Sequence, residues 1–154
     1  MLAEAIVCLA LNVYYEARSQ SVVEQIAVAQ VVINRVNDDR YPDTVCKVVK
    51  QGEKNHDGSM KKDRCQFSWY CDGATDKPYN KESWELALSV AKSVYEGKTT
   101  DLTEGATHYH AISVNPFWAK TLKRVTRIGK HIFYRWEKLW DGKTLNRKLK
   151  TLTS

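Results

Sequence analysis

The chain has 154 residues, 43% of them hydrophobic, which is enough to form one domain with a core of its own. Its 24 Lys and Arg against 18 Asp and Glu give a net charge of +6, which favours an anionic partner: nucleic acid, an anionic membrane or an envelope polymer. The cations are spread over several segments, a pattern more typical of a solvated surface than of a groove. No apolar run reaches the roughly 18 residues that cross a bilayer, which excludes a membrane-spanning helix.

The N-terminal segment has apolar residues at three- and four-residue steps, which predict a helix from Leu2 to about Ala17. No basic segment precedes its apolar stretch, so we expect a core helix rather than a secretory signal. Glu16 lies on the inward stripe of the last turn. Burial raises the pKa of a carboxyl group and suits it to general acid catalysis. The simpler interpretation is a charged helix end that pairs with Arg18.

Capping signals predict the next elements. The S-x-x-E box of Ser21 and Glu24 predicts a helix from Val22 to about Val36, and a short helix is expected over residues 44–51. Residues 52–80 have no helical period, so we expect a long loop that is functional or partly disordered. A fourth helix is expected to follow Asn80 and to end at Gly97, a residue that commonly stops helices.

The remaining elements are extended. Residues 107–116 predict a strand, residues 117–125 a short helix or turn, and alternating apolar residues around Gly129 and Lys130 predict a hairpin. We expect one domain over residues 1–140, followed by a basic tail over residues 141–154.

The chain contains four cysteines: Cys8, Cys46, Cys65 and Cys71. They allow two disulfides, a metal site or free thiols. Cys8 is expected to be a free, buried apolar side chain, whereas the polar loop near the other three is compatible with a disulfide whose pairing the sequence leaves open. Cys65 and Cys71 could also form a zinc or thiol site with His108 and His110, although their spacings are unusual for zinc. The two histidines are expected on opposite faces of their strand, which would make one of them structural.

Two aromatic segments, residues 65–71 and 107–111, suit a sugar ligand. Aromatic faces stack on sugar rings, and amide and hydroxyl groups bind sugar hydroxyls, although aromatic residues more often belong to a core. The candidate substrate-binding residues are Gln66, Ser68, Trp69, Tyr109 and His110.

Six ordered runs resemble a known family: YYEAR, EQIAVAQVVINRV, YPDTVCKVV, CQFSW, GATHYHA and IGKHIFYR. They resemble the SleB-type cell wall hydrolases, which include spore-cortex-lytic enzymes and phage endolysins. The resemblance implies a mainly helical α+β fold, lysozyme-like, in a single domain with a small β-hairpin. It implies cleavage of peptidoglycan glycan strands between N-acetylmuramic acid and N-acetylglucosamine, as a lytic transglycosylase that forms 1,6-anhydro-muramyl products. The catalytic acid of that family, the glutamate of the EAR motif, matches Glu16, and Tyr109 and His110 match its second aromatic segment.

The expected chemistry needs one acid. A water-using glycosidase needs two carboxylates, and no partner of Glu16 stands out in the matched runs. In a lytic transglycosylase the 6-hydroxyl of the muramic acid is the nucleophile, so Glu16 would serve as both acid and base. We expect Gln66, Ser68 and Tyr109 to stabilise the oxocarbenium. Neither a cofactor nor a metal is expected, and Glu24, Asp72 and Glu104 are the next candidates for the acid.

The family motif EARGE is altered here, because Ser19 and Gln20 replace its glycine and second glutamate. Serine tolerates a positive φ less well than glycine, and the lost carboxylate weakens a hydrolytic mechanism. A catalytically inactive glycan binder is therefore an alternative, as is a Cys/His site that acts on the peptide part of the wall.

The expected partner is peptidoglycan, bound by a monomer without nucleic acid and without stable insertion into a membrane. Because no export signal is visible, we expect synthesis in the cytoplasm and action on the cell wall. Either a phage lysin released at lysis or an excised domain of an exported enzyme fits this expectation.

Overall fold

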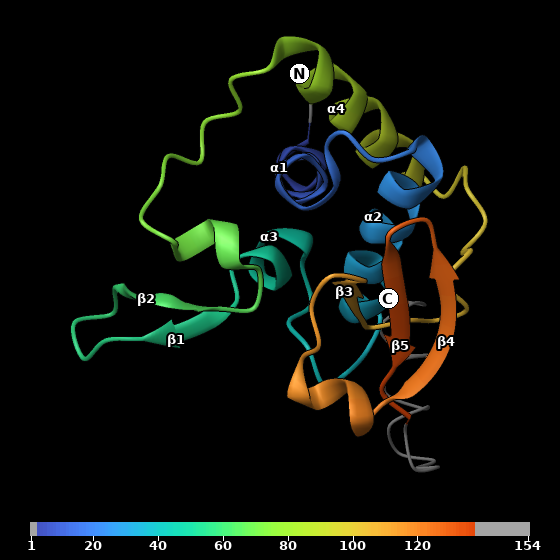
Figure 1. Cartoon of the computed structure of the whole chain (residues 1–154). Helices are drawn as coiled ribbons and strands as arrows, with labels where there is room; N and C mark the ends of the chain where they lie inside the picture. The colour runs from blue at the N-terminus through green and yellow to red at the C-terminus, as the bar shows by residue number, and fades with distance from the viewer. Residues whose placement is uncertain (1–2, 138–154) are drawn as a thin grey trace.

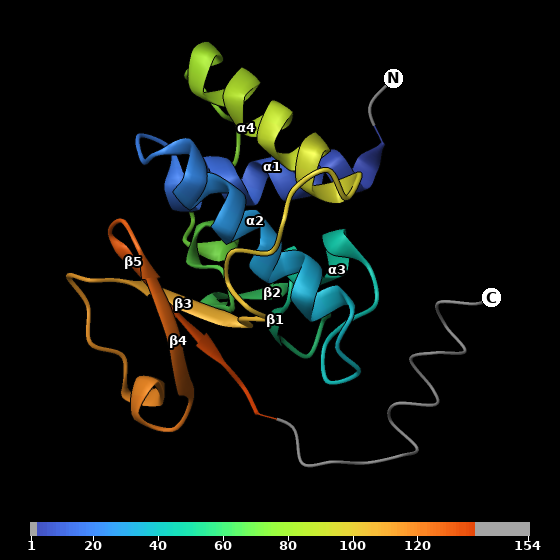
Figure 2. The same ribbon diagram turned by 90° about the vertical axis from the view of Figure 1, so that its right-hand side faces the viewer.

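The computed structural model describes residues 3–137 (Figures 1 and 2). Its helices are α1 (Glu4–Ala17), α2 (Val22–Val36), α3 (Val45–Val49) and α4 (Lys81–Tyr95). Its strands are β1 (Gly52–Lys54), β2 (Met60–Cys65), β3 (His108–Ala111), β4 (Lys123–Ile128) and β5 (His131–Arg135). Two 3₁₀ turns, η1 (Ser68–Cys71) and η2 (Phe117–Lys120), complete it. The basic tail expected over residues 141–154 lies outside the described residues.

The helices form the main core, with α1 packed against α2, α3 and α4. Leu9, Val13 and Tyr14 of α1 are fully buried in this core. The predicted caps are present: the side chain of Ser21 accepts a hydrogen bond from the backbone N–H of Glu24, and that of Asn80 from Ser83. Because these signals are local, the bounds of α2 and α4 agree with the prediction.

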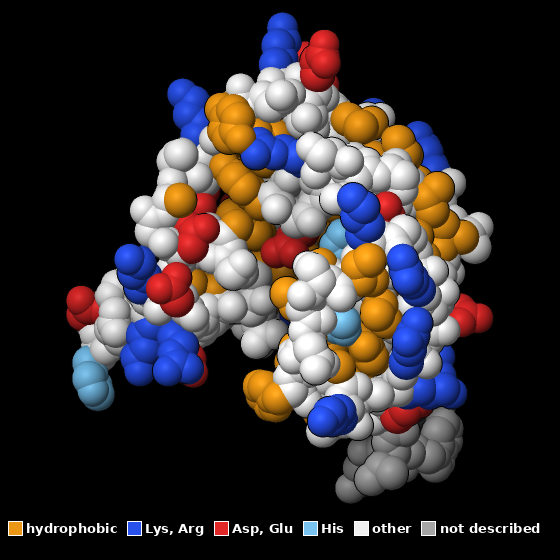
Figure 3. Space-filling view, in the orientation of Figure 1, with side chains coloured by type: hydrophobic (Ala, Val, Ile, Leu, Met, Phe, Trp, Pro, Cys, Tyr) orange, Lys and Arg blue, Asp and Glu red, His pale blue; other side chains and the backbone are white. Residues whose placement is uncertain are grey.

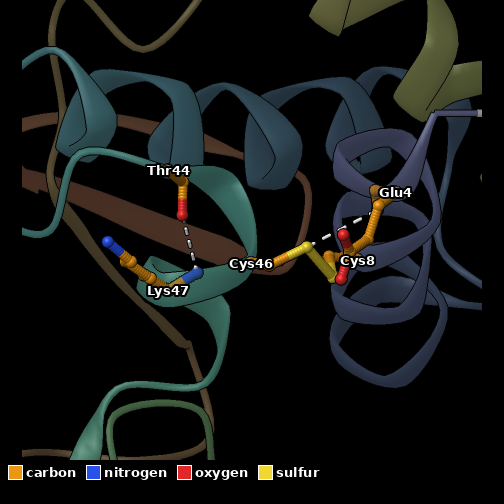
Figure 4. Close-up of a disulfide and its surroundings, with 5 residues drawn as sticks. All are labelled: Glu4, Cys8, Thr44, Cys46 and Lys47. Atoms are coloured by element: carbon orange, nitrogen blue, oxygen red, sulfur yellow. Dashed lines mark hydrogen bonds between the residues drawn. A yellow bond between two sulfur atoms is a disulfide. The ribbon is translucent and has the colours of Figure 1, made fainter.

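A disulfide between Cys8 and Cys46 joins α1 to α3 (Figure 4). The expectation that Cys8 is a free thiol is therefore wrong. Cys8 is buried as expected, but its partner lies on an element whose proximity to α1 only the tertiary fold determines.

The second disulfide, between Cys65 and Cys71, closes the segment from the end of β2 to the end of η1. Both sulfur atoms are used in this bond, so the alternative of a zinc or thiol site with His108 and His110 is wrong. The described residues contain no group of three or more His, Cys, Asp or Glu placed to hold a metal ion.

Two antiparallel sheets lie on either side of the molecule, β1–β2 and β3–β5–β4 (Figure 1). The three-stranded sheet includes the predicted hairpin around Gly129, and Phe133 of β5 packs on Val28 and Val31 of α2. The hairpin β1–β2 lies in the segment expected to be a loop. Its residues are mostly exposed, so no apolar alternation marked it as strands.

The helices and the two small antiparallel sheets confirm the expected α+β class. Within residues 3–137, none of the helices has the length and apolar character that crossing a membrane demands.

Candidate active site

A pocket of about 190 Å³ lies where the helical core meets the three-stranded sheet. Figure 3 shows a hollow at this place, between the surface over β1, β2 and η1 and the surface over β3, β4 and β5, with an acidic side chain in its depth. The residues that line the pocket are Glu16, Arg35, Gln66, Phe67, Ser68, His108, Tyr109 and Trp118. They come from α1, α2, the segment closed by the Cys65–Cys71 disulfide, β3 and η2.

Glu16 lies on the last turn of α1, part-buried, with its carboxyl group facing the pocket. Burial raises the pKa of this carboxyl group above the ordinary value, because the charged form loses hydration. The Tyr109 hydroxyl and the positive charge of Arg35 act in the opposite direction and only partly offset the effect. The group is thus biased toward its protonated form, as a general acid requires.

Arg35 is buried beneath the pocket with little exposed surface. Its Nε donates a hydrogen bond of 2.7 Å to the carbonyl oxygen of Thr107, and its guanidinium lies over the rings of Tyr41 and Phe67. Its Nη1 has no hydrogen-bond partner among the described residues. A buried donor without a partner is costly, so a ligand acceptor in the pocket would be stabilised there.

Tyr109 is part-buried at the pocket, and burial followed by the charge of Glu16 raises the pKa of its hydroxyl well above the ordinary value. The hydroxyl therefore stays protonated. The hydroxyl lowers the pKa of the nearby Glu16 carboxyl group. It has no partner among the described residues that meets the geometric criteria for a hydrogen bond. A modest movement would allow it to donate to the carboxylate that remains after Glu16 has released its proton.

Gln66, Phe67 and Ser68 reach the pocket from the disulfide-closed segment. The backbone N–H of Gln66 donates to the carbonyl oxygen of Gln51, and the Phe67 ring stacks near Tyr109 with 6.4 Å between ring centroids. Gln66 and Ser68 thus lie in the same pocket as Glu16 and Tyr109.

The structure does not bring Trp69 and His110 to this pocket. Trp69 is buried, stacks on Tyr15 and donates from Nε1 to Oδ1 of Asn12, one turn before Glu16. It therefore supports α1 from within the core. His110 forms a 2.8 Å hydrogen bond with the Tyr134 hydroxyl and lies outside the lining.

The expectation that His108 and His110 point to opposite faces is wrong. Side chains two residues apart on a strand share a face, and both imidazoles contact Trp118. His108 is the histidine that lines the pocket. Burial, assisted by Arg35 and Arg40, lowers the pKa of His108 to about 4, so its imidazole is neutral near pH 7.

Arg35, His108 and Trp118 were not among the predicted site residues. Arg35 occurs within a run that carries the family resemblance, which was the only available signal for it. His108 stands beside two predicted residues in the same segment. Trp118 reaches the pocket because η2 folds against the outer face of the sheet, a tertiary contact without a local signal.

The alternative acids Glu24, Asp72 and Glu104 do not line the pocket. Glu24 is buried elsewhere and accepts hydrogen bonds from the backbone of Lys130 and from His131. Asp72 accepts a hydrogen bond from the backbone of Ala74.

A mainly helical α+β domain with one part-buried acid in a polar pocket indicates a glycoside-cleaving class of enzyme. Residues 19–134 match the Cell Wall Hydrolase family model, and the chain belongs to this family of enzymes. The match begins three residues after Glu16.

A spore cortex-lytic enzyme of Halalkalibacterium halodurans is 29% identical over 122 residues, which are 79% of this chain and 32% of that protein. The chain thus spans about a third of the length of this relative.

Two solved structures share the fold, and this likeness confirms the expected lysozyme-like fold class. The catalytic domain of the germination-specific lytic transglycosylase SleB from Bacillus anthracis has a TM-score of 0.62 and 24% identity, over 87% of this chain and 97% of that one. The catalytic domain of the SleB protein of Bacillus cereus has a TM-score of 0.60 and 25% identity, over 88% and 93%.

Proposed function

We propose that this domain cleaves peptidoglycan glycan strands between N-acetylmuramic acid and N-acetylglucosamine as a lytic transglycosylase, with Glu16 as acid and base. One observation carries the proposal. Among the described residues that line the pocket, Glu16 is the only carboxylic acid, and its charged neighbour is the cation Arg35. A glycosidase that activates water needs a second carboxylate across the scissile bond.

In the first step the protonated Glu16 donates its proton to the glycosidic oxygen, and the bond from that oxygen to C1 of the muramic acid breaks. The leaving sugar takes the proton, and positive charge develops on the muramyl ring. Arg35 and the Tyr109 hydroxyl lower the pKa of Glu16, which makes the release of the proton easier. The side-chain oxygens of Gln66 and Ser68 are the dipoles available to the developing oxocarbenium.

In the second step the Glu16 carboxylate takes the proton of the muramyl 6-hydroxyl, and O6 bonds to C1. The product is a 1,6-anhydro ring, and Glu16 regains the proton that it gave away. Because the nucleophile is part of the substrate, little entropy is lost in bringing it to C1.

The two disulfides support a site of action outside the cytoplasm, where cysteines are seldom reduced. The proposed setting is the cell wall, reached either by a phage lysin at lysis or by an exported enzyme that contains this domain. The proposal takes the domain to act as a monomer.

The test is mass spectrometry of the soluble products that the native chain and the Glu16→Gln variant release from purified peptidoglycan. The native chain is expected to yield anhydro-muramyl products, and the variant none, because an amide cannot donate the proton. The Glu104→Gln variant is the matched control and should cleave as the native chain does, since Glu104 lies outside the pocket.

Two outcomes would contradict the proposal. Reducing-end products from the native chain would show that water is the nucleophile and that a second acid is required. A native chain that binds peptidoglycan but releases no product would show that the domain is an inactive glycan binder.

A further inference from the structure

Residues 105–136 contain no Asp or Glu, and they include three histidines. They also include six Lys and Arg, so the formal charge of this segment is +6, as is the net charge of the whole chain. These cations are Lys120, Lys123, Arg124, Arg127, Lys130 and Arg135. The segment forms β3, η2, β4 and β5, so these cations lie on and beside the three-stranded sheet, where Lys123 and Arg135 form ion pairs with Glu137.

Arg124 and Arg127 of β4 point away from the core. Arg124 pairs with Tyr134 and Arg127 with Ile132, whereas Phe133 between them is buried against α2. Paired residues of antiparallel strands share a face, and this one is the outer face. Figure 3 shows Lys and Arg side chains along the margin of this sheet, beside hydrophobic side chains.

An apolar loop adjoins this face. Ile112, Val114 and Phe117 lie between β3 and the first residue of η2, with 44%, 52% and 89% of their surfaces exposed. The next residue, Trp118, packs on His108 and Tyr134. Phe117 is therefore directed into solvent while its neighbour anchors the loop, and a group of exposed apolar side chains rimmed by polar residues marks an interaction site.

We propose that the exposed cations Arg124 and Arg127 of the outer face and the loop 112–117 form a docking surface for an anionic phospholipid bilayer. Exposed aromatic and aliphatic side chains enter the boundary between headgroups and acyl chains, and flanking cations bind the anionic headgroups. A polyanion would bind the cations but would not bury the apolar side chains of Ile112, Val114 and Phe117. A sugar would stack on Phe117 but would leave the aliphatic side chains of Ile112 and Val114 exposed.

Binding of this kind is peripheral. Charge attraction and insertion of a few apolar side chains act together, and neither alone holds a protein stably on a membrane. Such binding would keep the domain at the side of the wall that faces the membrane. The inference does not depend on the catalytic role of Glu16.

The experiment is co-sedimentation of the full chain with vesicles of phosphatidylglycerol and phosphatidylcholine, compared with vesicles of phosphatidylcholine alone. Binding is expected to the anionic vesicles and to decrease with salt. The Phe117→Ser variant should bind at least about tenfold more weakly. Each of Arg124→Gln and Arg127→Gln should weaken binding by about fivefold.

Two matched controls lie on other surfaces of the chain. Tyr79 is 74% exposed, so Tyr79→Ser removes an exposed ring outside the loop. Lys62→Gln removes an exposed cation from β2. Both variants should bind as the native chain does, and so should Glu16→Gln, which separates this inference from the catalytic proposal.

Three results would overturn the inference: no binding to anionic vesicles, equal binding to neutral vesicles, or salt-sensitive binding that Phe117→Ser leaves unchanged. The last would identify the surface as a general site for polyanions. Circular dichroism and thermal unfolding of the Phe117→Ser and native chains, measured on the same preparations, check that each variant is folded.

Discussion

The carboxylate of Glu24 and the imidazole of His131 lie 3.0 Å apart in the interior, although 107 positions separate the two residues in the chain. Burial raises the pKa of Glu24, but hydrogen bonds from His131, from the backbone of Lys130 and from Ser21 together outweigh it and hold the pKa below the ordinary value. The start of α2 is thus bound to the turn between β4 and β5. This contact fixes the sheet, and with it Tyr109 and His108, against the helix that carries Arg35.

Gly129 makes that contact possible. Its φ is 56°, and a side chain at this position would overlap the carboxylate of Glu24. We expect Gly129→Ala to lower the free energy of unfolding by roughly 2–4 kcal/mol, from backbone strain together with steric overlap. Urea denaturation measures the loss.

Gly97→Ala is the control for that substitution. Gly97 also has a positive φ, of 73°, but a Cβ there would meet no atom within 4 Å. Only backbone strain remains, so we expect Gly97→Ala to lower the free energy of unfolding by about 1 kcal/mol. Equal losses for the two variants would show that the overlap with Glu24 contributes nothing.

The raised pKa of Glu16 makes stability depend on pH. The folded protein binds this proton more tightly than the unfolded chain does, so the stabilisation is complete below the ordinary carboxyl pKa. It is lost as the pH rises through the raised pKa, where a charged carboxylate is buried. Replacement by an amide removes that cost, so Glu16→Gln should gain more stability relative to the native chain at pH 8 than at pH 4. Glu85→Gln, at an exposed position of α4, serves as the control in the same denaturation series.

Arg35 should control the pH range of cleavage. Its positive charge lowers the pKa of Glu16, so Arg35→Gln should raise that pKa and move the basic limb of the kcat/KM profile to higher pH. Arg35→Lys keeps the charge and should leave the limb near its native position. A purely structural role for Arg35 would lower the rate of both variants without moving the limb, and circular dichroism would reveal any unfolding.

The two disulfides should differ in what they support. In the loop-closure estimate, Cys8–Cys46, with a separation of 38 residues, stabilises the fold by about 4 kcal/mol, and Cys65–Cys71, with a separation of 6, by about 2 kcal/mol. The second bond, however, closes the segment that holds Gln66 and Ser68 in the pocket. We therefore expect the cleavage rate of the Cys65→Ala, Cys71→Ala double variant to fall at least about tenfold below the native rate, a larger loss than when the Cys8–Cys46 bond is removed.

The corresponding double variant of Cys8 and Cys46 should lose more stability and retain more activity per folded molecule. Thermal unfolding and initial cleavage rates, measured on both double variants, give the comparison. If both variants lost activity only in proportion to their folded fraction, the disulfide-closed segment would have no role in positioning.

The sequence predicted those parts of the fold that depend on neighbouring residues. Ser21 and Asn80 cap their helices through bonds that span three residues, so pattern alone located α2 and α4. The inward position of Glu16 also follows from helical periodicity. By contrast, the partner of Cys8 and the approach of Arg35, His108 and Trp118 to Glu16 depend on packing between distant segments. The sequence places Trp69 among the substrate-binding residues because aromatic rings stack on sugars and it lies beside Gln66 and Ser68, but the 3₁₀ turn directs its ring into the core.

Ser19 stands where the family motif has glycine, and it adopts the left-handed conformation with a φ of 73°. The chain therefore keeps the backbone turn after α1 and bears the strain of a side chain there. We expect Ser19→Gly to raise the free energy of unfolding by about 0.5–1 kcal/mol, because glycine adopts this φ without steric cost but loses more entropy on folding. Ser89→Gly, at an exposed position within α4, is the matched control. Its free energy of unfolding should fall by about 0.5–1 kcal/mol, because glycine is unfavourable inside a helix.

The same pair of variants tests the altered EARSQ motif. Since the turn is already in place, Ser19→Gly should cleave peptidoglycan at the native rate, and its gain should be confined to stability. A large increase in cleavage by Ser19→Gly, with no increase for Ser89→Gly, would instead show that serine distorts the end of α1 and displaces Glu16 from its working position.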